Sequence, residues 1–307
     1  MILITWTSGF IWFHLAKRLL KEWYEVIWVD NENDYYDRIY KVERREILET
    51  YSNFRFYNKN INNIWELEYI FKSNKIEKVV NLAWQPWVRY SLEDPFSYIQ
   101  TNIVWFHNIL FLCKKYEVIK LVYASSSSVY GNTKDTNHPI SLYGATKKAD
   151  ELLAHSYSCT FGTPTIWLRF YTVYWPYWRP DMAMFKFTNR IAQNKPIDVY
   201  NWWNMKRDFT YVNDIVEWIV KALNYEVQYA VYDLWYWESV WIRDVISLIE
   251  WELWKKAVLN FLQLQDWDVY ETLSNSSKAR EELWRTPKVD IREWIDRFVS
   301  WYKDLYL

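Results

Sequence analysis

A tyrosine and a lysine four residues apart follow a run of serines, and these three residue types could together move a proton. Tyr143 and Lys147 lie in one helical pattern, and Ser126 ends the apolar run before it. Residues four apart share a helix face, so the Lys147 ammonium can lie near the Tyr143 phenol. A nearby cation favours the phenolate of a group whose free pKa is about 10. The spacing predicts Tyr143 as the proton acceptor, with a serine hydroxyl from the preceding run orienting the substrate oxygen.

A second candidate site opens the chain, where an apolar run leads through Trp6-Thr7-Ser8-Gly9 into a helical pattern from Phe10. A dinucleotide-binding turn needs glycines there, because the backbone must approach the pyrophosphate. Only Gly9 is glycine, but glycine in place of Trp6 and Trp12 would complete G-x-x-G-x-x-G. Asp30 closes the next apolar run, where a carboxylate would bind the adenosine ribose and select NAD. The alternative for Asp30 is a solvated carboxylate at a strand end.

These residues need a scaffold in which short apolar runs alternate with longer helical patterns. Strands are expected at 2–5, 25–30, 54–57, 78–83, 120–126 and 165–170. Helices are expected at 10–21, 64–71, 95–116, 142–161, 183–193, 215–223, 242–251 and 291–303. This order predicts a Rossmann-like, doubly wound parallel α/β sheet with a smaller mixed α/β lobe for the substrate. We expect an NAD-binding domain over 1–172, joined by 206–236, and a substrate-binding lobe over 173–205 and 237–307.

Composition excludes several classes of function. The 37 Lys+Arg and 38 Asp+Glu of the 307 residues give a net charge of -1, so no basic surface for nucleic acid is expected. No apolar run reaches the roughly 18 residues of a membrane span, and the N-terminus lacks a signal-peptide pattern. The four histidines lack metal-ligand spacing, so no metal is expected. Two cysteines, Cys113 and Cys159, cannot form a disulfide framework, which favours a reducing cytoplasm.

One feature of the composition is unusual. The chain has 4 glycines and 23 tryptophans, whereas average usage of about 7% predicts roughly 21 glycines in this length. Glycine is therefore depleted by about as many residues as tryptophan is in excess.

The chain resembles the extended short-chain dehydrogenase/reductases, and within them the nucleotide-sugar epimerases that are similar to UDP-glucuronate 4-epimerases. The resemblance covers nearly the whole chain, and its specific segments are 30–37, 88–91, 124–131, 143–147, 168–174, 179–182 and 207–211. Tryptophan stands where the family pattern has glycine or another small residue at Trp6, Trp12, Trp28, Trp87, Trp105, Trp167, Trp175, Trp178, Trp203, Trp235, Trp237 and Trp267.

This resemblance implies catalytic roles for Ser126, Tyr143 and Lys147, and NAD as a tightly held cofactor. The residues expected at NAD are Trp6, Gly9, Phe10, Ile11, Trp12, Asp30, Asn31, Asn33, Asn60, Ile61, Leu82, Ala83, Gln85, Asn102, Tyr143, Lys147, Tyr171 and Val173. Several of these follow predicted strands, at the sheet edge where cofactors bind.

The resemblance also implies a UDP-sugar substrate, held by Arg89, Ser127, Ser128, Thr172, Arg179, Arg207 and Asp268. Arg207 would meet the diphosphate, Asp268 the uridine ribose, and Arg179 a carboxylate at C5 of the sugar, since a guanidinium binds a carboxylate through two hydrogen bonds. For each arginine the alternative is a surface ion pair. The resemblance further implies a homodimer.

The implied reaction is 4-epimerisation of UDP-glucuronate to UDP-galacturonate, through a 4-keto sugar. The related 4,6-dehydratases carry Thr-Asp-Glu where this chain has Ser126-Ser127-Ser128, and without those carboxyls water elimination lacks its acid and base. The alternatives are another UDP-hexose 4-epimerase, a nucleotide-sugar oxidoreductase or decarboxylase of the same superfamily, and a catalytically inactive nucleotide-binding scaffold, which tryptophans at 6 and 12 would favour.

Overall fold

The chain divides into two compact units, each with its own core. A computed structural model describes residues 1–5, 10–32, 38–82, 85, 88, 90–131, 133, 136, 138–174, 183–234, 239–263, 277–283 and 290–307. Unit 1 is built from Met1–Phe170, Val216–Leu234 and Ser277–Arg285, and unit 2 from Tyr171–Ile215, Trp235–Ser276 and Thr286–Leu307.

Unit 1 is built on a parallel sheet to which the described residues contribute seven strands, in the order β10-β6-β5-β4-β1-β2-β3. The strands are β1 (Ile2–Thr5), β2 (Val26–Asp30), β3 (Phe54–Asn58), β4 (Lys78–Asn81), β5 (Lys120–Ser126), β6 (Thr165–Phe170) and β10 (Tyr229–Leu234). The order reverses between β1 and β4, where an open parallel sheet binds ligands at the carboxyl ends of its strands. The predicted Rossmann-like fold is confirmed.

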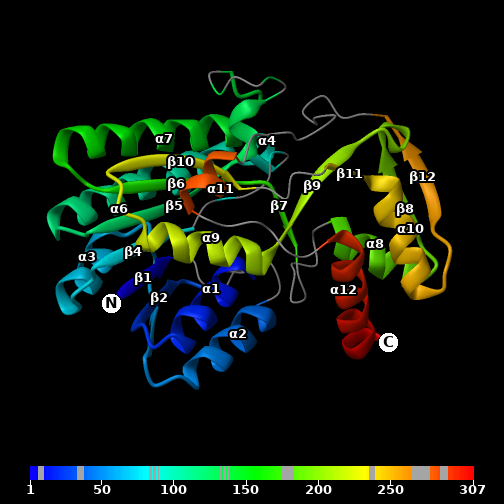
Figure 1. The fold of residues 1–307 in the computed structure, drawn as a ribbon, viewed down its shortest axis with the longest axis horizontal. Helices are drawn as coiled ribbons and strands as arrows, with labels where there is room; N and C mark the ends of the chain where they lie inside the picture. The colour runs from blue at the N-terminus through cyan, green and yellow to red at the C-terminus, as the bar shows by residue number, and fades with distance from the viewer. Residues whose placement is uncertain are drawn as a thin grey trace. The chain divides into compact units, whose positions relative to one another are not determined.

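Helices cover both faces of this sheet (Figure 1). Those of unit 1 are α1 (Phe10–Lys21), α2 (Ile39–Glu49), α3 (Ile64–Ser73), α4 (Tyr90–Glu93), α5 (Pro95–Tyr98), α6 (Trp105–Lys115), α7 (Leu142–Phe161), α11 (Ser277–Leu283) and most of α9 (Val212–Asn224). Leu3, Val79 and Leu121 pack beneath α3 and α6 in one buried cluster. Because successive strand residues point to opposite faces, the remaining strand positions face the other layer of helices.

The helix expected over 95–116 is interrupted. It consists of α5, a π-helical segment η1 (Ile99–Val104) and α6. A π-helical turn adds one residue and rotates the side chains that follow, and such turns are frequent at functional sites. Here the turn holds Asn102, which is 1% exposed.

Unit 2 is smaller and mixed. Its described elements are β7 (Thr172–Tyr174), α8 (Ala183–Ala192), β8 (Pro196–Tyr200), η3 (Asn201–Trp203), β9 (Lys206–Tyr211), β11 (Ser239–Trp241), α10 (Ile242–Leu253), β12 (Val258–Leu262) and α12 (Ile291–Tyr306). β9 lies between β11 and β7, and β12 pairs with β8.

The unit boundaries differ from the expected ones by two residues at 171–172 and at 235–236, and by longer segments at two further places. Residues 206–215 belong to unit 2 because β9 pairs with β7 and β11 rather than with the large sheet. Conversely, 277–285 returns to unit 1, where Tyr232 of β10 donates a 2.6 Å hydrogen bond to Glu282 of α11. Pairings so distant in the sequence leave no local signal.

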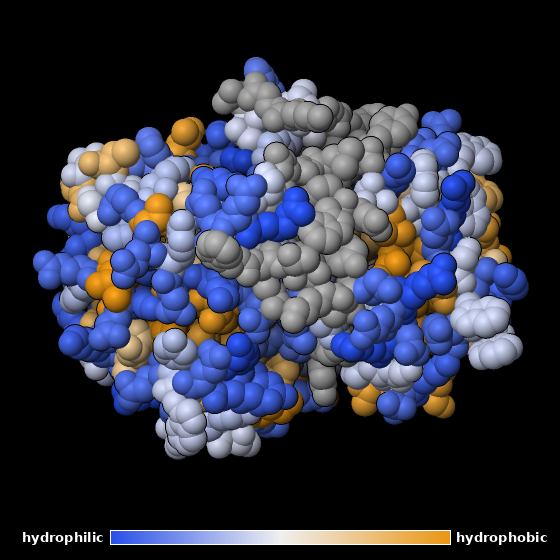
Figure 2. Space-filling view, viewed as in Figure 1, coloured by the Kyte–Doolittle hydropathy of each residue, from blue (hydrophilic) through white to orange (hydrophobic). Residues whose placement is uncertain are grey.

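The surface drawn in Figure 2 mixes hydrophilic and apolar side chains, and hydrophilic ones predominate. In the described part of the chain, no helix combines the length and apolarity needed to cross a membrane.

Candidate active site

The predicted base and its lysine are both buried on the first turns of α7. Ser141 caps this helix, accepting a 3.0 Å hydrogen bond from the backbone N–H of Gly144. Tyr143 is 7% exposed and Lys147 is fully buried. Their spacing of four residues keeps them on neighbouring turns of one face. The helix therefore carries both residues on one face.

Ser126 ends β5 at the carboxyl edge of the sheet and is nearly buried. Its Oγ accepts a 3.2 Å hydrogen bond from the Ser128 backbone N–H and lies 3.2 Å from the Ser128 Oγ. The short helix η2 (Ser127–Tyr130) that follows lies against α7, because the Gly144 backbone touches the Ser128 carbonyl. The serine turn and the start of the tyrosine helix are therefore in direct contact.

Lys147 meets two further buried groups. Its Nζ donates to the Tyr123 hydroxyl and lies 3.6 Å from Oδ2 of Asp150, to which Tyr123 in turn donates. Burial lowers the pKa of Lys147 to about 8 and raises the pKa of Asp150 to about 7. Burial and the Asp150 charge raise the pKa of Tyr123, so this phenol stays protonated.

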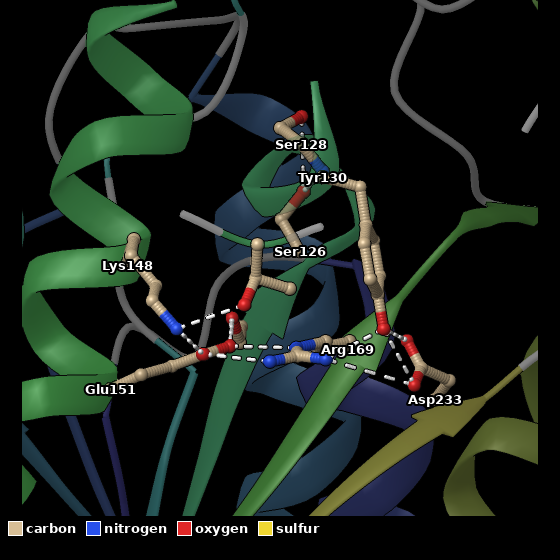
Figure 3. A network of polar contacts seen from close by, with 9 residues as sticks. Ser126, Ser128, Tyr130, Lys148, Glu151, Arg169 and Asp233 are labelled. Atoms are coloured by element: carbon tan, nitrogen blue, oxygen red, sulfur yellow. Dashed lines mark hydrogen bonds and ion pairs between the residues drawn. The ribbon is translucent and has the colours of Figure 1, made fainter. Parts of the chain in front are cut away.

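A second polar network anchors the serine strand to α7 (Figure 3). Arg169 of β6 makes two 2.8 Å hydrogen bonds to the Glu151 carboxylate, and Ser125 of β5 donates a third of 2.7 Å. Arg169 also donates to Tyr130, whose hydroxyl bonds Asp233 of β10. Although burial raises the pKa of Glu151, the Arg169 contacts outweigh it and lower that pKa overall. The network holds Ser125 in place, and it thereby positions the backbone of the next residue, Ser126.

Several residues expected at NAD gather near the switch between β1 and β4. The Thr5 hydroxyl donates a buried 2.7 Å hydrogen bond to Asn81, which joins the ends of these two strands. Asp30 ends the neighbouring strand β2, is 1% exposed, and accepts a 2.6 Å hydrogen bond from the Glu32 backbone N–H. Phe10, Ile11 and Trp12 are buried at the start of α1, and Asn31 is exposed.

Asn102 and Gln85 were expected at the cofactor, and the structure brings them together. Asn102 accepts a 2.7 Å hydrogen bond from the Gln85 backbone N–H and donates a 3.0 Å one to Thr146 of α7. The π-helical turn thus ties the segment after β4, where Leu82 is buried, to the tyrosine helix. Asn60 is used locally: its side-chain oxygen accepts from the Asn62 backbone N–H, beside the buried Ile61.

The other described site residues belong to unit 2. Tyr171 and Val173 are buried, and Thr172 and Val173 pair with β9 at Phe209 and Thr210. Arg207 of β9 donates a 2.9 Å hydrogen bond to the Lys206 carbonyl. The remaining predicted residues lie outside the described part of the chain: Trp6, Gly9, Asn33, Ala83, Arg89, Arg179 and Asp268.

Known proteins with similar sequences give the family. Residues 3–298 match the family described as GDP-mannose 4,6 dehydratase. The chain belongs to this family. Protein CapI of Staphylococcus aureus is 42% identical, with 99% of each sequence covered. The UDP-glucuronate 4-epimerase of Thermodesulfobacterium geofontis is 37% identical over 98% of this chain and 96% of that protein.

Solved structures agree with this assignment. The UDP-glucuronic acid 4-epimerase of Bacillus cereus, in complex with UDP-glucuronic acid and NAD, is 32% identical and superimposes with a TM-score of 0.92 over 99% of each chain. The resemblance to nucleotide-sugar epimerases of the extended short-chain dehydrogenase/reductases is confirmed.

Sequence reasoning missed Tyr123, Asp150, Glu151 and Arg169. Asp150 stands three residues after Lys147, a spacing that puts it on the same helix face, so its position was open to inference. Tyr123 and Arg169 come from strands, and only the register of β5 and β6 brings them to α7. A sequence pattern carries no such information.

Proposed function

We propose that this protein is an NAD-dependent UDP-sugar 4-epimerase that interconverts UDP-glucuronate and UDP-galacturonate. The observation that carries the proposal is the serine turn packed against the first turn of α7, on which Tyr143 and Lys147 are both buried. This combination supplies a hydroxyl, a proton acceptor and a cation at one sheet edge.

The strand order and Asp30 fit NAD, whereas the first turn fits it only with glycine in place of Trp6 and Trp12. The strand order reverses between β1 and β4, and the buried Asp30 carboxylate ends the strand next to β1, where an adenosine ribose would be bound. When bound, NAD would supply the hydride acceptor and donor of the reaction. Unit 1 is accordingly the proposed NAD-binding part, and unit 2 the proposed UDP-sugar-binding part.

The side chains of the chain handle the proton. The Tyr143 phenolate accepts the proton of the sugar 4-hydroxyl, and the Ser126 hydroxyl holds the same oxygen in place. The Lys147 ammonium favours the phenolate, so that proton transfer can proceed near neutral pH. Returning the proton from Tyr143 to the opposite epimer regenerates the site.

Dehydration is disfavoured although the family takes its description from a dehydratase. Elimination of water needs an acid and a base beside the sugar. Ser127 and Ser128 follow Ser126 here, and neither hydroxyl can replace a carboxylate as that base.

UDP-glucuronate is the proposed substrate because two relatives named as 4-epimerases of this nucleotide sugar align with almost the whole chain. Arg179 is the proposed partner of its carboxylate, Arg207 of the diphosphate, and Asp268 of the uridine ribose. Arg89, Ser127, Ser128 and Thr172 complete the proposed sugar contacts.

We also propose a homodimer. Apolar side chains are exposed on α7 and on two helices that contact it: Leu152 of α7 is 60% exposed, Phe96 of α5 84% and Phe111 of α6 38%. A second copy would cover them. Sedimentation should give a dimer, and Leu152→Arg should weaken it, whereas a monomeric parent protein would refute the proposal.

A cytoplasmic location is proposed as well. Cys113 is buried, Cys159 is exposed, and both are free thiols, as a reducing compartment would keep them.

The test of the proposed activity is to incubate the protein with UDP-glucuronate and to separate the products by chromatography. UDP-galacturonate should form with no accumulation of NADH. Tyr143→Phe should abolish this conversion and leave NAD bound, because the lost hydroxyl handles a proton and does not hold the cofactor. A UDP-pentose would indicate a decarboxylase, accumulating NADH an oxidoreductase, and no product an inactive scaffold. Parent-like turnover by Tyr143→Phe would refute its role as the base.

A further inference from the structure

Behind the Tyr143 helix, three polar side chains form a buried chain of hydrogen bonds. The Lys147 Nζ donates to the Tyr123 hydroxyl, and this hydroxyl donates to Oδ2 of Asp150. The Lys147 Nζ also lies 3.6 Å from the same carboxylate oxygen and 4.3 Å from the centre of the Tyr123 ring. All three side chains are 1% exposed or less.

The surroundings of this chain are apolar. The Tyr123 ring lies 4.2 Å from the ring of Phe106 and 4.6 Å from that of Trp167, centre to centre. Among the described residues, Oδ1 of Asp150 has no hydrogen-bond partner. A carboxyl group so placed destabilises the fold unless a charged neighbour compensates it. Lys147 is that neighbour, so the Asp150 carboxylate acts on the Lys147 ammonium.

We infer that Asp150 is a positioning residue: acting directly and through the Tyr123 hydroxyl, it fixes the Lys147 ammonium one helical turn from Tyr143 and keeps it protonated. The catalytic consequence rests on the proposed function, whereas the effect on Lys147 itself does not. Tyr123 is a second positioning residue, because its hydroxyl links the Lys147 ammonium to the Asp150 carboxylate.

Electrostatics gives the sign of the effect. Burial lowers the pKa of Lys147, while Asp150 and, more weakly, Glu151 raise it. Among the described residues, the Tyr143 phenol is a further titratable group that acts on the trio, and it raises the pKa of Tyr123. Glu151 is already held by Arg169 and Ser125. Without the Asp150 charge, the pKa of Lys147 should fall from about 8 toward neutrality, and a neutral amine does not stabilise the Tyr143 phenolate.

The variants Asp150→Asn and Tyr123→Phe test this inference. Asparagine keeps the size of Asp150 and an oxygen that can accept from Tyr123, but removes the charge. Phenylalanine keeps the ring packing and removes the relay hydroxyl. A matched control exists on α3 and α6, where Glu68 accepts hydrogen bonds from Lys115 at 2.6 Å and Tyr116 at 2.9 Å. Glu68→Gln removes a similar carboxylate that does not contact Lys147.

The direct measurement is an NMR titration of protein labelled at the lysine ε-carbon, with the Lys147 signal assigned by its loss in Lys147→Met. Asp150→Asn should lower the pKa of Lys147 by at least about one pH unit, a tenfold loss of proton affinity. Tyr123→Phe should lower it less, and Glu68→Gln should leave it unchanged. In turnover, the limb at which activity falls with rising pH should move to lower pH by the same amount in Asp150→Asn, with KM unchanged.

An unchanged pKa of Lys147 in folded Asp150→Asn would overturn the inference. If that variant does not fold, an unchanged pKa in Tyr123→Phe would do the same. If the parent protein turns over no UDP-sugar, the proposed function fails, but the titration still decides the role of Asp150.

Discussion

The first turn of α7 touches the Ser128 carbonyl so closely that a Cβ on Gly144 would lie 2.4 Å from that oxygen. Real Cβ atoms do not approach a backbone oxygen to this distance, so any side chain here must push the serine turn and the tyrosine helix apart. The residue after Tyr143 is therefore glycine for reasons of space.

Gly144→Ala should reduce both stability and turnover. Overpacking of this kind reduces the free energy of unfolding by about 1–3 kcal/mol, and displacement of Ser126 from Tyr143 should reduce kcat further. The control is Gly162→Ala at the end of the same helix, where φ is 68° and, apart from its chain neighbours, no described residue lies within 4 Å of the added Cβ. It should cost about 1 kcal/mol from backbone strain and leave kcat unchanged. Equal kcat values in the two variants would contradict the packing argument.

Glu151→Gln should be strongly destabilising at neutral pH. It removes the carboxylate that accepts two hydrogen bonds from Arg169 and leaves only Asp233, at 3.8 Å, among the described residues. Breaking a buried pair costs about 3–5 kcal/mol. Glu49→Gln is the matched control: Glu49 pairs with Arg45 at 2.9 Å but is 43% exposed, so its loss should cost under about 1 kcal/mol. Denaturant unfolding measures both.

The same pair predicts a pH dependence. Because folding lowers the pKa of Glu151, its stabilising contribution is present above the unfolded pKa of about 4.3 and is lost as the pH falls through the lower folded value. The difference in stability between the parent protein and Glu151→Gln should therefore shrink below about pH 4. A difference that stays constant down to pH 2 would show that the carboxylate charge is not what stabilises the pair.

Four tryptophans occupy left-handed backbone conformations that favour glycine: Trp23, Trp202, Trp203 and Trp254, with φ of 64°, 48°, 71° and 54°. Trp23 and Trp254 are also 84% and 83% exposed, so they contribute little packing. Replacing either by glycine should raise the free energy of unfolding by about 1–2 kcal/mol. Trp65→Gly is the control, since Trp65 is 76% exposed but lies in the helix α3, and it should destabilise. Destabilisation by all three substitutions would refute the strain argument.

Buried tryptophans also destabilise the fold. Among the described residues, the indole N–H groups of Trp28, Trp105, Trp167 and Trp218 have no hydrogen-bond partner, at a cost of about 1–3 kcal/mol each. We predict that the protein isolated from its native organism carries glycine at most of the positions that read tryptophan here. Such a pattern would arise if that organism translated one codon as glycine instead of tryptophan. Its intact mass should then be a few kilodaltons below 38.0 kDa. A mass of 38.0 kDa would refute this prediction.

The choice of sugar depends on Arg179. If this residue pairs with the carboxylate at C5, Arg179→Ala should reduce kcat/KM for UDP-glucuronate far more than for UDP-glucose, which has no charge there. Loss of a charged hydrogen-bonded contact is worth about 2–3 kcal/mol, or a factor of roughly 30–150. Equal losses for both sugars would show that Arg179 does not recognise C5.

Sequence patterns predicted the elements of unit 1 that carry the catalytic residues. β1, β5, β6, α1 and α7 begin and end at the expected residues, because their apolar runs are bounded by residues such as the Ser141 cap and Gly162. The interruption at Asn102 was not predicted, since a π-helical turn shifts the apolar pattern by one residue without ending it. Neither the Asp150 trio nor the Arg169 network was predicted, because each depends on strands brought together by the register of the sheet.

The most direct test of the account follows the hydrogen at C4 of the sugar. UDP-glucuronate with deuterium at C4 should be converted in ordinary water to UDP-galacturonate that keeps the deuterium at C4, because the hydride leaves and returns within the protein. Mass spectrometry and proton NMR of the separated product measure the label. Loss of the deuterium to solvent, or no UDP-galacturonate at all, would contradict the account.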